Sequence, residues 1–215
     1  MAKAPHNIIC LEAEWLLIKS TNKFSLRTVD LLNFFSDFYG CDFIHRVVPT
    51  NSTLRYYLDY FEKEQRKKRS KLASYDVVYI CSHGTKGKIC LENDVTEFSE
   101  KRENDCDDEW NGFVSLTQLA ETYPDFFKGK YVHFSSCSTL ADETEVRNFL
   151  KITKAKMVSG YCSDVLAMQS AITDLILFDA IMNNERVGNL NSERSLFRKN
   201  YGKILDELKF KMYLA

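Results

Sequence analysis

Short runs of β-branched and aromatic residues alternate along this chain with longer stretches in which hydrophobic residues recur at helical spacing. The runs have the length of buried strands, and their alternation with helical stretches is typical of the crossover units that build a parallel sheet. Five runs are expected to form strands, at residues 7–13, 43–48, 76–82, 131–136 and 156–161. The pattern therefore predicts an α/β fold with a mostly parallel sheet and helices on both faces.

The stretches between and after these strands are expected to form helices. In the first of them, Leu32 and Phe35 share one face, and Gly40 follows where a helix would end. The expected helices cover residues 25–40, 52–72, 115–127, 143–154, 166–185 and 192–214. The last one opens with Ser192 as N-cap, and we expect this amphipathic helix to cover the sheet or to meet a partner. Residues 1–215 are expected to form a single domain.

The connection between the third and fourth strands is unusually long. It begins as a hairpin, with Gly84 and Gly87 flanking the turn, and continues as an acidic loop at residues 92–109. A loop of this length without secondary structure is uncommon in a compact domain unless it is functional or disordered. We interpret it as a solvated loop, with docking of a basic substrate or a role in activation as the alternatives.

The charge balance argues against nucleic acid and membranes as partners. The 215 residues include 29 basic and 30 acidic side chains, a net charge of -1, so no overall field holds the protein on an anionic surface. The basic segment 63–71 is interpreted as the end of a helix, where cations oppose the negative end of the helix dipole. No apolar run approaches the roughly 20 residues needed to cross a bilayer, and the N-terminus lacks a secretion signal. We expect a cytoplasmic protein.

Seven cysteines are scattered along the chain without a CxxC pair, so we expect them to be reduced. Free cysteine is among the most buried residue types. Five of them are expected to be small buried hydrophobic residues: Cys10, Cys41, Cys81, Cys90 and Cys162. Cys137 differs from these because it directly follows the end of a predicted strand.

His83 and Cys137 are the residues on which we base a functional hypothesis. Each follows a strand, and open α/β sheets build their sites at such strand ends. A thiol needs a nearby base to form thiolate at neutral pH, and histidine has a suitable pKa. The 54-residue spacing from His83 to Cys137 admits one crossover between neighbouring strands. Gly84 would let the backbone approach a substrate closely, so that its N–H stabilises an oxyanion together with the N–H of Cys137.

This order of strand, His-Gly, hairpin, helix, strand and Cys resembles the caspase-like cysteine peptidases, a group that includes caspases, metacaspases, gingipains, legumains, separases and bacterial CHAT domains. The spacing agrees, since the caspase histidine lies about 50 residues before its cysteine. The similarity is closest to CHAT proteins, in the segments SHGTKGKICL (82–91), SLTQLAE (115–121) and VHFSSCST (132–139). The resemblance covers about residues 75 to 182. We therefore expect a three-layer caspase-like (caspase-hemoglobinase) fold with strand order 2-1-3-4-5.

The resemblance implies a cysteine endopeptidase that cleaves proteins through a thioester acyl-enzyme. It makes His83 the base, Cys137 the nucleophile, and the amides of Gly84 and Cys137 the oxyanion hole. The caspase pentapeptide Q-A-C-x-G is absent, and Ser135 stands where metacaspases have an aspartate, so substrate specificity does not transfer.

Asp164 and Ser135 are the expected substrate-binding residues. Members of the group often line the pocket for the residue before the cut near the position of Asp164, and an acidic pocket would select Arg or Lys. The alternative for Asp164 is the cap of the following helix.

The other histidines, His6, His45 and His133, are interpreted as residues bonded to the backbone. A zinc site that joins His133 to Cys137 is disfavoured, because four residues of extended strand separate their Cα atoms by roughly 13 Å. No phosphate-binding glycine motif is present, and we expect neither a metal nor an organic cofactor.

Two other functions remain open at this stage. The first is a catalytically silent interaction module that binds a protein partner through the C-terminal helix or the acidic loop. The second is an acyltransferase that uses the same thiol. For the peptidase, the expected partners are a protein or peptide substrate and a regulatory protein, because an active peptidase must be restrained.

Overall fold

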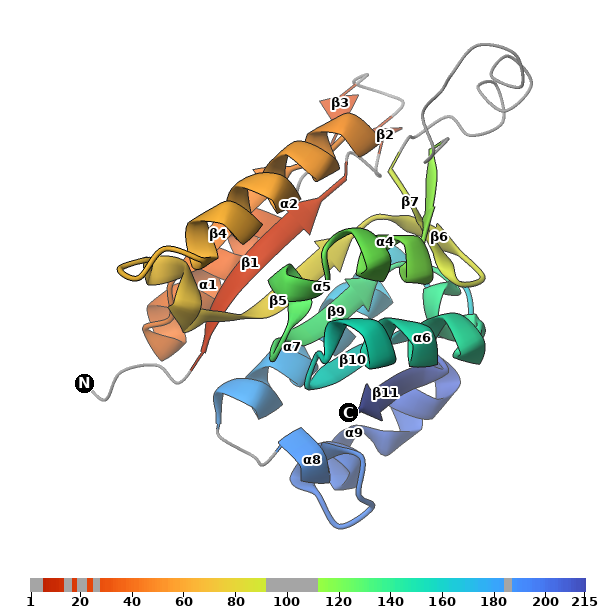
Figure 1. Ribbon diagram of the computed structural model, residues 1–215. Coiled ribbons are helices and arrows are strands. Elements are labelled where there is room, and N and C mark those ends of the chain that lie inside the picture. The colour runs from red at the N-terminus through yellow and green to blue at the C-terminus, as the bar shows by residue number, and fades with distance from the viewer. Residues whose placement is uncertain (1–5, 14–16, 19–22, 25–27, 92–111, 184–186) are drawn as a thin grey trace.

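The computed structural model describes residues 6–13, 17–18, 23–24, 28–91, 112–183 and 187–215. Its centre is a six-stranded sheet with the strand order β11-β10-β9-β5-β1-β4 (Figure 1). The strands are β1 (Asn7–Glu12), β4 (Phe43–Val47), β5 (Tyr75–Cys81), β9 (Tyr131–Ser135), β10 (Met157–Tyr161) and β11 (Phe210–Leu214). The acidic loop at 92–109 lies outside the described residues.

The five predicted strands are all present, and they pair in parallel as predicted. Numbered as in the sequence prediction, β4, β1, β5, β9 and β10 give the order 2-1-3-4-5. The mostly parallel α/β architecture is therefore confirmed.

Helices cover both faces of this sheet, because alternate side chains of each buried strand point to opposite sides. Ile9, Leu11 and Val78 belong to one core cluster, whereas Ile8, Cys10 and Val77 belong to the other. The first face packs against α2 (Asn51–Gln65), α4 (Leu116–Thr122), α5 (Pro124–Phe127) and α6 (Glu143–Thr153). The second packs against α1 (Thr28–Tyr39), α7 (Ala167–Met182), α8 (Val187–Leu190) and α9 (Leu196–Glu207).

The predicted C-terminal helix at 192–214 is wrong in its second half. Helix α9 is capped by Ser195 rather than Ser192, and it ends at Glu207. Lys209 then adopts a left-handed conformation with φ 48°, and β11 pairs antiparallel with β10. Within β11, Phe210 and Met212 are buried and alternate with exposed Lys211. This period of two is a strand pattern that the helical interpretation overlooked.

Two other predicted helices are shorter than expected. The helix predicted at 52–72 ends at Gln65, and a separate 3-10 turn, η1, spans Lys71–Ser74. The helix predicted at 115–127 is divided into α4 and α5 because Pro124 starts the second segment. Proline lacks the N–H that would continue the first helix, and it restricts the preceding residue.

The hairpin predicted after β5 is present as β6 (His83–Thr85) and β7 (Lys88–Cys90), with Gly87 at φ 73° in its turn. A third strand, β8 (Phe113–Ser115), pairs with β7 and was not predicted. A two-stranded pair, β2 (Leu17–Ile18) and β3 (Lys23–Phe24), was not predicted either. In the described part of the chain, no helix has the length and apolar character required to traverse a bilayer.

Candidate active site

The site is built at the carboxyl ends of β5 and β9, which are neighbours in the sheet. Cys81 of β5 is paired with Ser135 of β9, and the N–H of Ser82 donates to the carbonyl of Ser135 at 3.3 Å. His83 and Cys137 each lie two residues beyond this pair. The two segments therefore leave the sheet at the same level, from strands that lie about 4.8 Å apart.

The hairpin that begins with His83 packs against the turn that contains Cys137. A Cβ atom on Gly84 would lie 2.6 Å from the carbonyl oxygen of Cys137 and 2.3 Å from Oγ1 of Thr139. Further along, the N–H of Gly87 donates to the Thr139 carbonyl at 3.2 Å, and Oγ1 of Thr139 donates to the Lys88 carbonyl at 3.1 Å. Any side chain at position 84 would clash with these atoms. The absence of a Cβ on Gly84 therefore allows the His83 and Cys137 segments to pack this closely.

The turn after Cys137 has a defined conformation of its own. Ser138 is left-handed, with φ 54°, and its N–H donates to the carbonyl of Ser163 at 3.0 Å. Below it, the buried hydroxyls of Ser136 and Thr139 are hydrogen-bonded at 2.6 Å. These bonds fix the backbone on both sides of Cys137.

The Cys137 thiol is half-buried and faces the connection from β10 to α7. Its Sγ accepts a hydrogen bond from the N–H of Val165 at 3.5 Å. Val165 immediately precedes Leu166, the N-cap of the 16-residue helix α7. The thiol in turn donates to the carbonyl of Val165 at 3.7 Å, so both contacts hold Sγ beside the start of α7.

His83 is exposed and Gly84 is half-buried, so both remain accessible from solvent. In the β6–β7 hairpin, Thr85–Lys88 closes the turn, and Gly84–Ile89 is the next pair. Because hydrogen-bonded and non-hydrogen-bonded pairs alternate in an antiparallel ladder, the N–H of Gly84 points away from β7. The register therefore leaves this N–H outside the β6–β7 ladder.

Asp164 lies beside the Cys137 turn. Its exposed carboxylate accepts a hydrogen bond from the Ser138 hydroxyl at 2.9 Å. Helix α7 has Leu166 as its N-cap and lacks a side-chain cap bond, so the alternative interpretation of Asp164 as a helix cap is wrong. Its substrate-binding role stays a prediction.

Ser135 contacts a buried polar cluster that the sequence analysis missed. Its hydroxyl donates to Oδ2 of Asp174, a carboxylate of α7 that is 1% exposed. Tyr79 and Tyr161 also donate to this carboxylate, at 2.7 and 2.6 Å, and Nε2 of His133 lies 2.6 Å from Oδ1. The role of Ser135 in substrate binding stays a prediction.

Four partners saturate the acceptor positions of Asp174. Burial opposes ionisation, but His133 and the hydroxyl donors hold the pKa of Asp174 below its usual value. Burial, followed by the Asp174 charge, raises the pKa of Tyr79 and of Tyr161 well above 10. The sequence signal for this cluster was an aspartate inside the apolar stretch 166–185.

The histidines outside the site are bonded to side chains, so the predicted backbone bonding is wrong. Nδ1 of His133 contacts the Ser159 hydroxyl at 2.9 Å. His45 lies 2.7 Å from the fully buried Glu12, and His6 lies 2.7 Å from Asp76. No cluster of three or more potential metal ligands occurs within the described ranges.

The expected burial of cysteines is confirmed for Cys10, Cys41, Cys81 and Cys90, whereas Cys162 is only half-buried. Burial raises the pKa of the thiols of Cys10, Cys41, Cys81 and Cys162, which disfavours their thiolate forms. Cys162 donates to the Leu140 carbonyl at 3.1 Å. It is thus a suitable half-buried control thiol for experiments on Cys137.

A comparison with protein families matches residues 5–214 to DUF6642, a family of unknown function. The chain belongs to this family. The DUF6642 match spans the complete six-stranded sheet and the strand ends that carry His83 and Cys137. No curated protein matches the sequence.

Proposed function

We propose that this protein is a cysteine endopeptidase of the caspase-like group, with His83 as base and Cys137 as nucleophile. The observation that carries the proposal is the close packing of the Gly84 backbone against Cys137, beyond the paired positions Cys81 and Ser135. The sheet order and the two helical layers are compatible with a caspase-like fold, which is part of the same proposal.

The proposed reaction begins when His83 accepts the thiol proton of Cys137. Sγ then attacks the scissile carbonyl, and the oxygen of the tetrahedral intermediate accepts hydrogen bonds from the N–H groups of Gly84 and Cys137. His83 returns its proton to the leaving amine as the C–N bond breaks, leaving a thioester. Water, deprotonated by His83, hydrolyses the thioester and regenerates the thiol.

Specificity in this proposal comes from Asp164. Its carboxylate is exposed next to Ser138, one residue beyond the nucleophile. A carboxylate at this place would pair with Arg or Lys immediately before the cut. The substrate is then a protein or peptide with a basic residue at the cleavage site.

A peptide-library cleavage profile tests the proposal. Wild type is expected to cut after Arg or Lys, and Cys137→Ala is expected to lose at least about 10³-fold of the rate, because no other group supplies the nucleophile. Cys162→Ala is the matched control and should retain activity. Asp164→Asn should retain cleavage but weaken the preference for a basic residue.

Two outcomes contradict the proposal. Cleavage by Cys137→Ala at the wild-type rate would show that Cys137 is not the nucleophile. A wild-type protein that cuts no library member and whose thiol shows ordinary reactivity would instead support the catalytically silent interaction module.

A further inference from the structure

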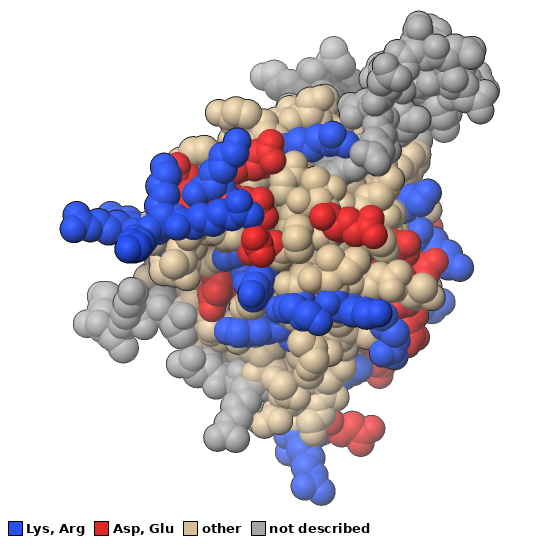
Figure 2. Space-filling view, viewed as in Figure 1, with Lys and Arg blue, Asp and Glu red and all other residues tan. Residues whose placement is uncertain are grey.

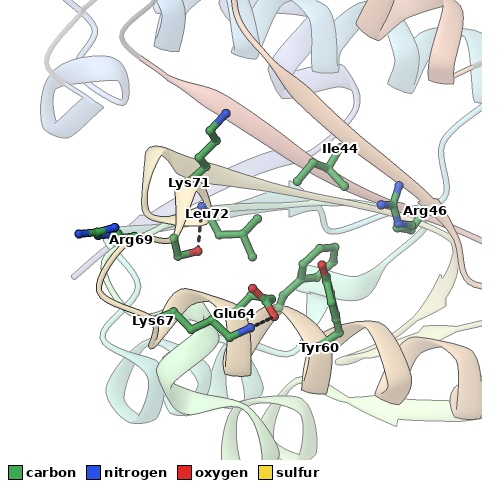
Figure 3. A pocket seen from close by; sticks show the side chains of 10 residues that line it. Ile44, Arg46, Tyr60, Glu64, Lys67, Arg69, Lys71 and Leu72 are labelled. Atoms are coloured by element: carbon green, nitrogen blue, oxygen red, sulfur yellow. Dashed lines mark hydrogen bonds and ion pairs between the residues drawn. The ribbon is translucent and has the colours of Figure 1, made fainter.

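A groove of about 340 Å³ lies between the edge strand β4 and the carboxyl end of α2 (Figure 3). Ile44 and Arg46 come from β4, Tyr60 from α2, and Arg69 and Leu72 from the connection to β5. Three strands lie in order from this edge to β9: β4, β1 and β5. The groove is therefore separate from the candidate active site.

The floor of the groove is apolar. Phe61 is 1% exposed, and Ile44 and Leu72 pack against the core cluster beneath the groove. Tyr60 stands beside them with 47% of its surface exposed. This floor suits an aliphatic side chain from a bound partner.

The rim of the groove is cationic. Four cations and one carboxylate line it, and the carboxylate, Glu64, is paired with Lys67. Arg46 is held with its guanidinium 5.7 Å above the ring of Tyr57 and donates to the His45 carbonyl. Within the described residues, neither Arg69 nor Lys71 forms an ion pair with a carboxylate.

Figure 2 shows the wider setting of this rim, with lysine and arginine side chains gathered over the end of α2 and the segment after it. The chain there reads Arg66, Lys67, Lys68, Arg69, Ser70 and Lys71. This local positive charge contrasts with a net charge of -1 for the whole chain. Positive charge is therefore concentrated around the groove although the chain as a whole is nearly neutral.

The third feature is the open edge of β4. Among the described elements β4 pairs with β1 alone, so the outward backbone groups of Phe43, His45 and Val47 have no ladder partner. The His45 carbonyl accepts from the Arg46 guanidinium, which an added strand would displace. An exposed sheet edge binds an extended peptide by adding it as a further strand, while alternate side chains enter neighbouring pockets.

We propose that this groove binds an extended acidic segment of a protein partner as an additional strand on β4. An aliphatic side chain of the segment rests on Ile44 and Leu72. The carboxylates of the bound segment pair with Arg46, Arg69 and Lys71. Pairing with the β4 backbone aligns the bound segment along the strand, and the cationic rim favours segments that carry acidic residues.

Fluorescence anisotropy with a labelled eight-residue peptide of alternating glutamate and valine tests this proposal on the full chain. Wild type should bind, and the double variant Arg69→Glu with Lys71→Glu should bind at least about tenfold more weakly. Both residues are exposed, so the variant should fold normally. The matched control, Lys199→Glu with Lys203→Glu on α9, makes the same charge change on the opposite layer and should bind as wild type does.

A second peptide separates strand addition from charge attraction. Methylation of the backbone nitrogens on the edge-pairing side of the peptide should abolish binding, and the unmodified peptide should protect the outward amides of Phe43, His45 and Val47 from hydrogen exchange. The proposal is overturned if the wild type fails to bind, if the methylated peptide binds equally well, or if the control variant loses as much affinity. Displacement of the peptide by equimolar pyrophosphate, or tighter binding of an oligonucleotide at the same residues, would also overturn it.

Discussion

Asp174 shows how a single buried charge is stabilised in this protein. The carboxylate accepts hydrogen bonds from Tyr79, Ser135 and Tyr161 and pairs with His133, all from strands of the central sheet. A buried ion with this many partners is retained in its charged form, although burial alone would neutralise it. The cluster ties α7 to β5, β9 and β10 directly beneath the strand end that carries Cys137.

Replacing Asp174 with asparagine is expected to lower the free energy of unfolding by about 3–5 kcal/mol near pH 7, because His133 and the hydroxyl donors lose a buried anionic partner. The pKa of Asp174 is lower in the folded protein than its ordinary value of 3.8. Its contribution is therefore complete above that value and is lost as the pH falls through the lowered pKa. The difference between wild type and variant should shrink below about pH 4.

Urea unfolding at a series of pH values measures this effect. Asp206→Asn is the control, since Asp206 forms an exposed ion pair with Arg198 that contributes at most about 1 kcal/mol. A difference for Asp174→Asn that stays constant down to pH 2 would contradict the charge assignment.

At the scale of elements, the β6–β7 hairpin and the turn at 136–139 form one packed unit. The contact depends on Gly84, where an added methyl group would meet Ser136 at 2.9 Å in addition to Cys137 and Thr139. A carbonyl oxygen of the backbone cannot move aside as a flexible side chain would. The hairpin itself must shift if this glycine is replaced.

Gly84→Ala is expected to lower the free energy of unfolding by about 1–3 kcal/mol through overpacking. Cleavage should fall about 10²-fold, because a displacement near 1 Å separates His83 from Cys137. Gly202→Ala is the matched control, since no atom lies within 4 Å of its added Cβ in helix α9. It should stabilise the helix by about 0.5–1 kcal/mol and leave cleavage unchanged.

Thermal unfolding and the library assay together test this pair of variants. Wild-type activity in Gly84→Ala would show that the hairpin contact does not position the site.

The elements also show what the sequence can predict. The five parallel strands are buried on both faces, so their apolar runs stand out, and the helical stretches between them predict parallel pairing. Strand β11 was missed because the period of two at Phe210 and Met212 directly follows the helical period of α9. The positions of His83 and Cys137 at strand ends could be predicted, whereas the bond between Ser135 and Asp174 could not, because it joins residues 39 apart through tertiary packing.

On the scale of the whole molecule, the proposed active site and the cationic groove lie at different places on the central sheet. The carboxyl ends of the central strands β5 and β9 carry the proposed catalytic residues, and the edge strand β4 carries the cationic groove. If both proposals hold, a partner at β4 binds without blocking the active site. The regulatory partner expected for a peptidase then has a surface of its own on this chain.

The central claim is that Cys137 is a nucleophile activated by His83, and covalent labelling tests it most directly. Wild-type protein is treated with an acyloxymethyl ketone that carries lysine, and the modified residue is mapped by mass spectrometry. The account predicts one label per chain on Cys137, at least about tenfold slower labelling in His83→Ala, and unchanged labelling in Cys162→Ala. Labelling of Cys137 at the same rate in wild type and His83→Ala, or labelling spread over several cysteines, would contradict the account.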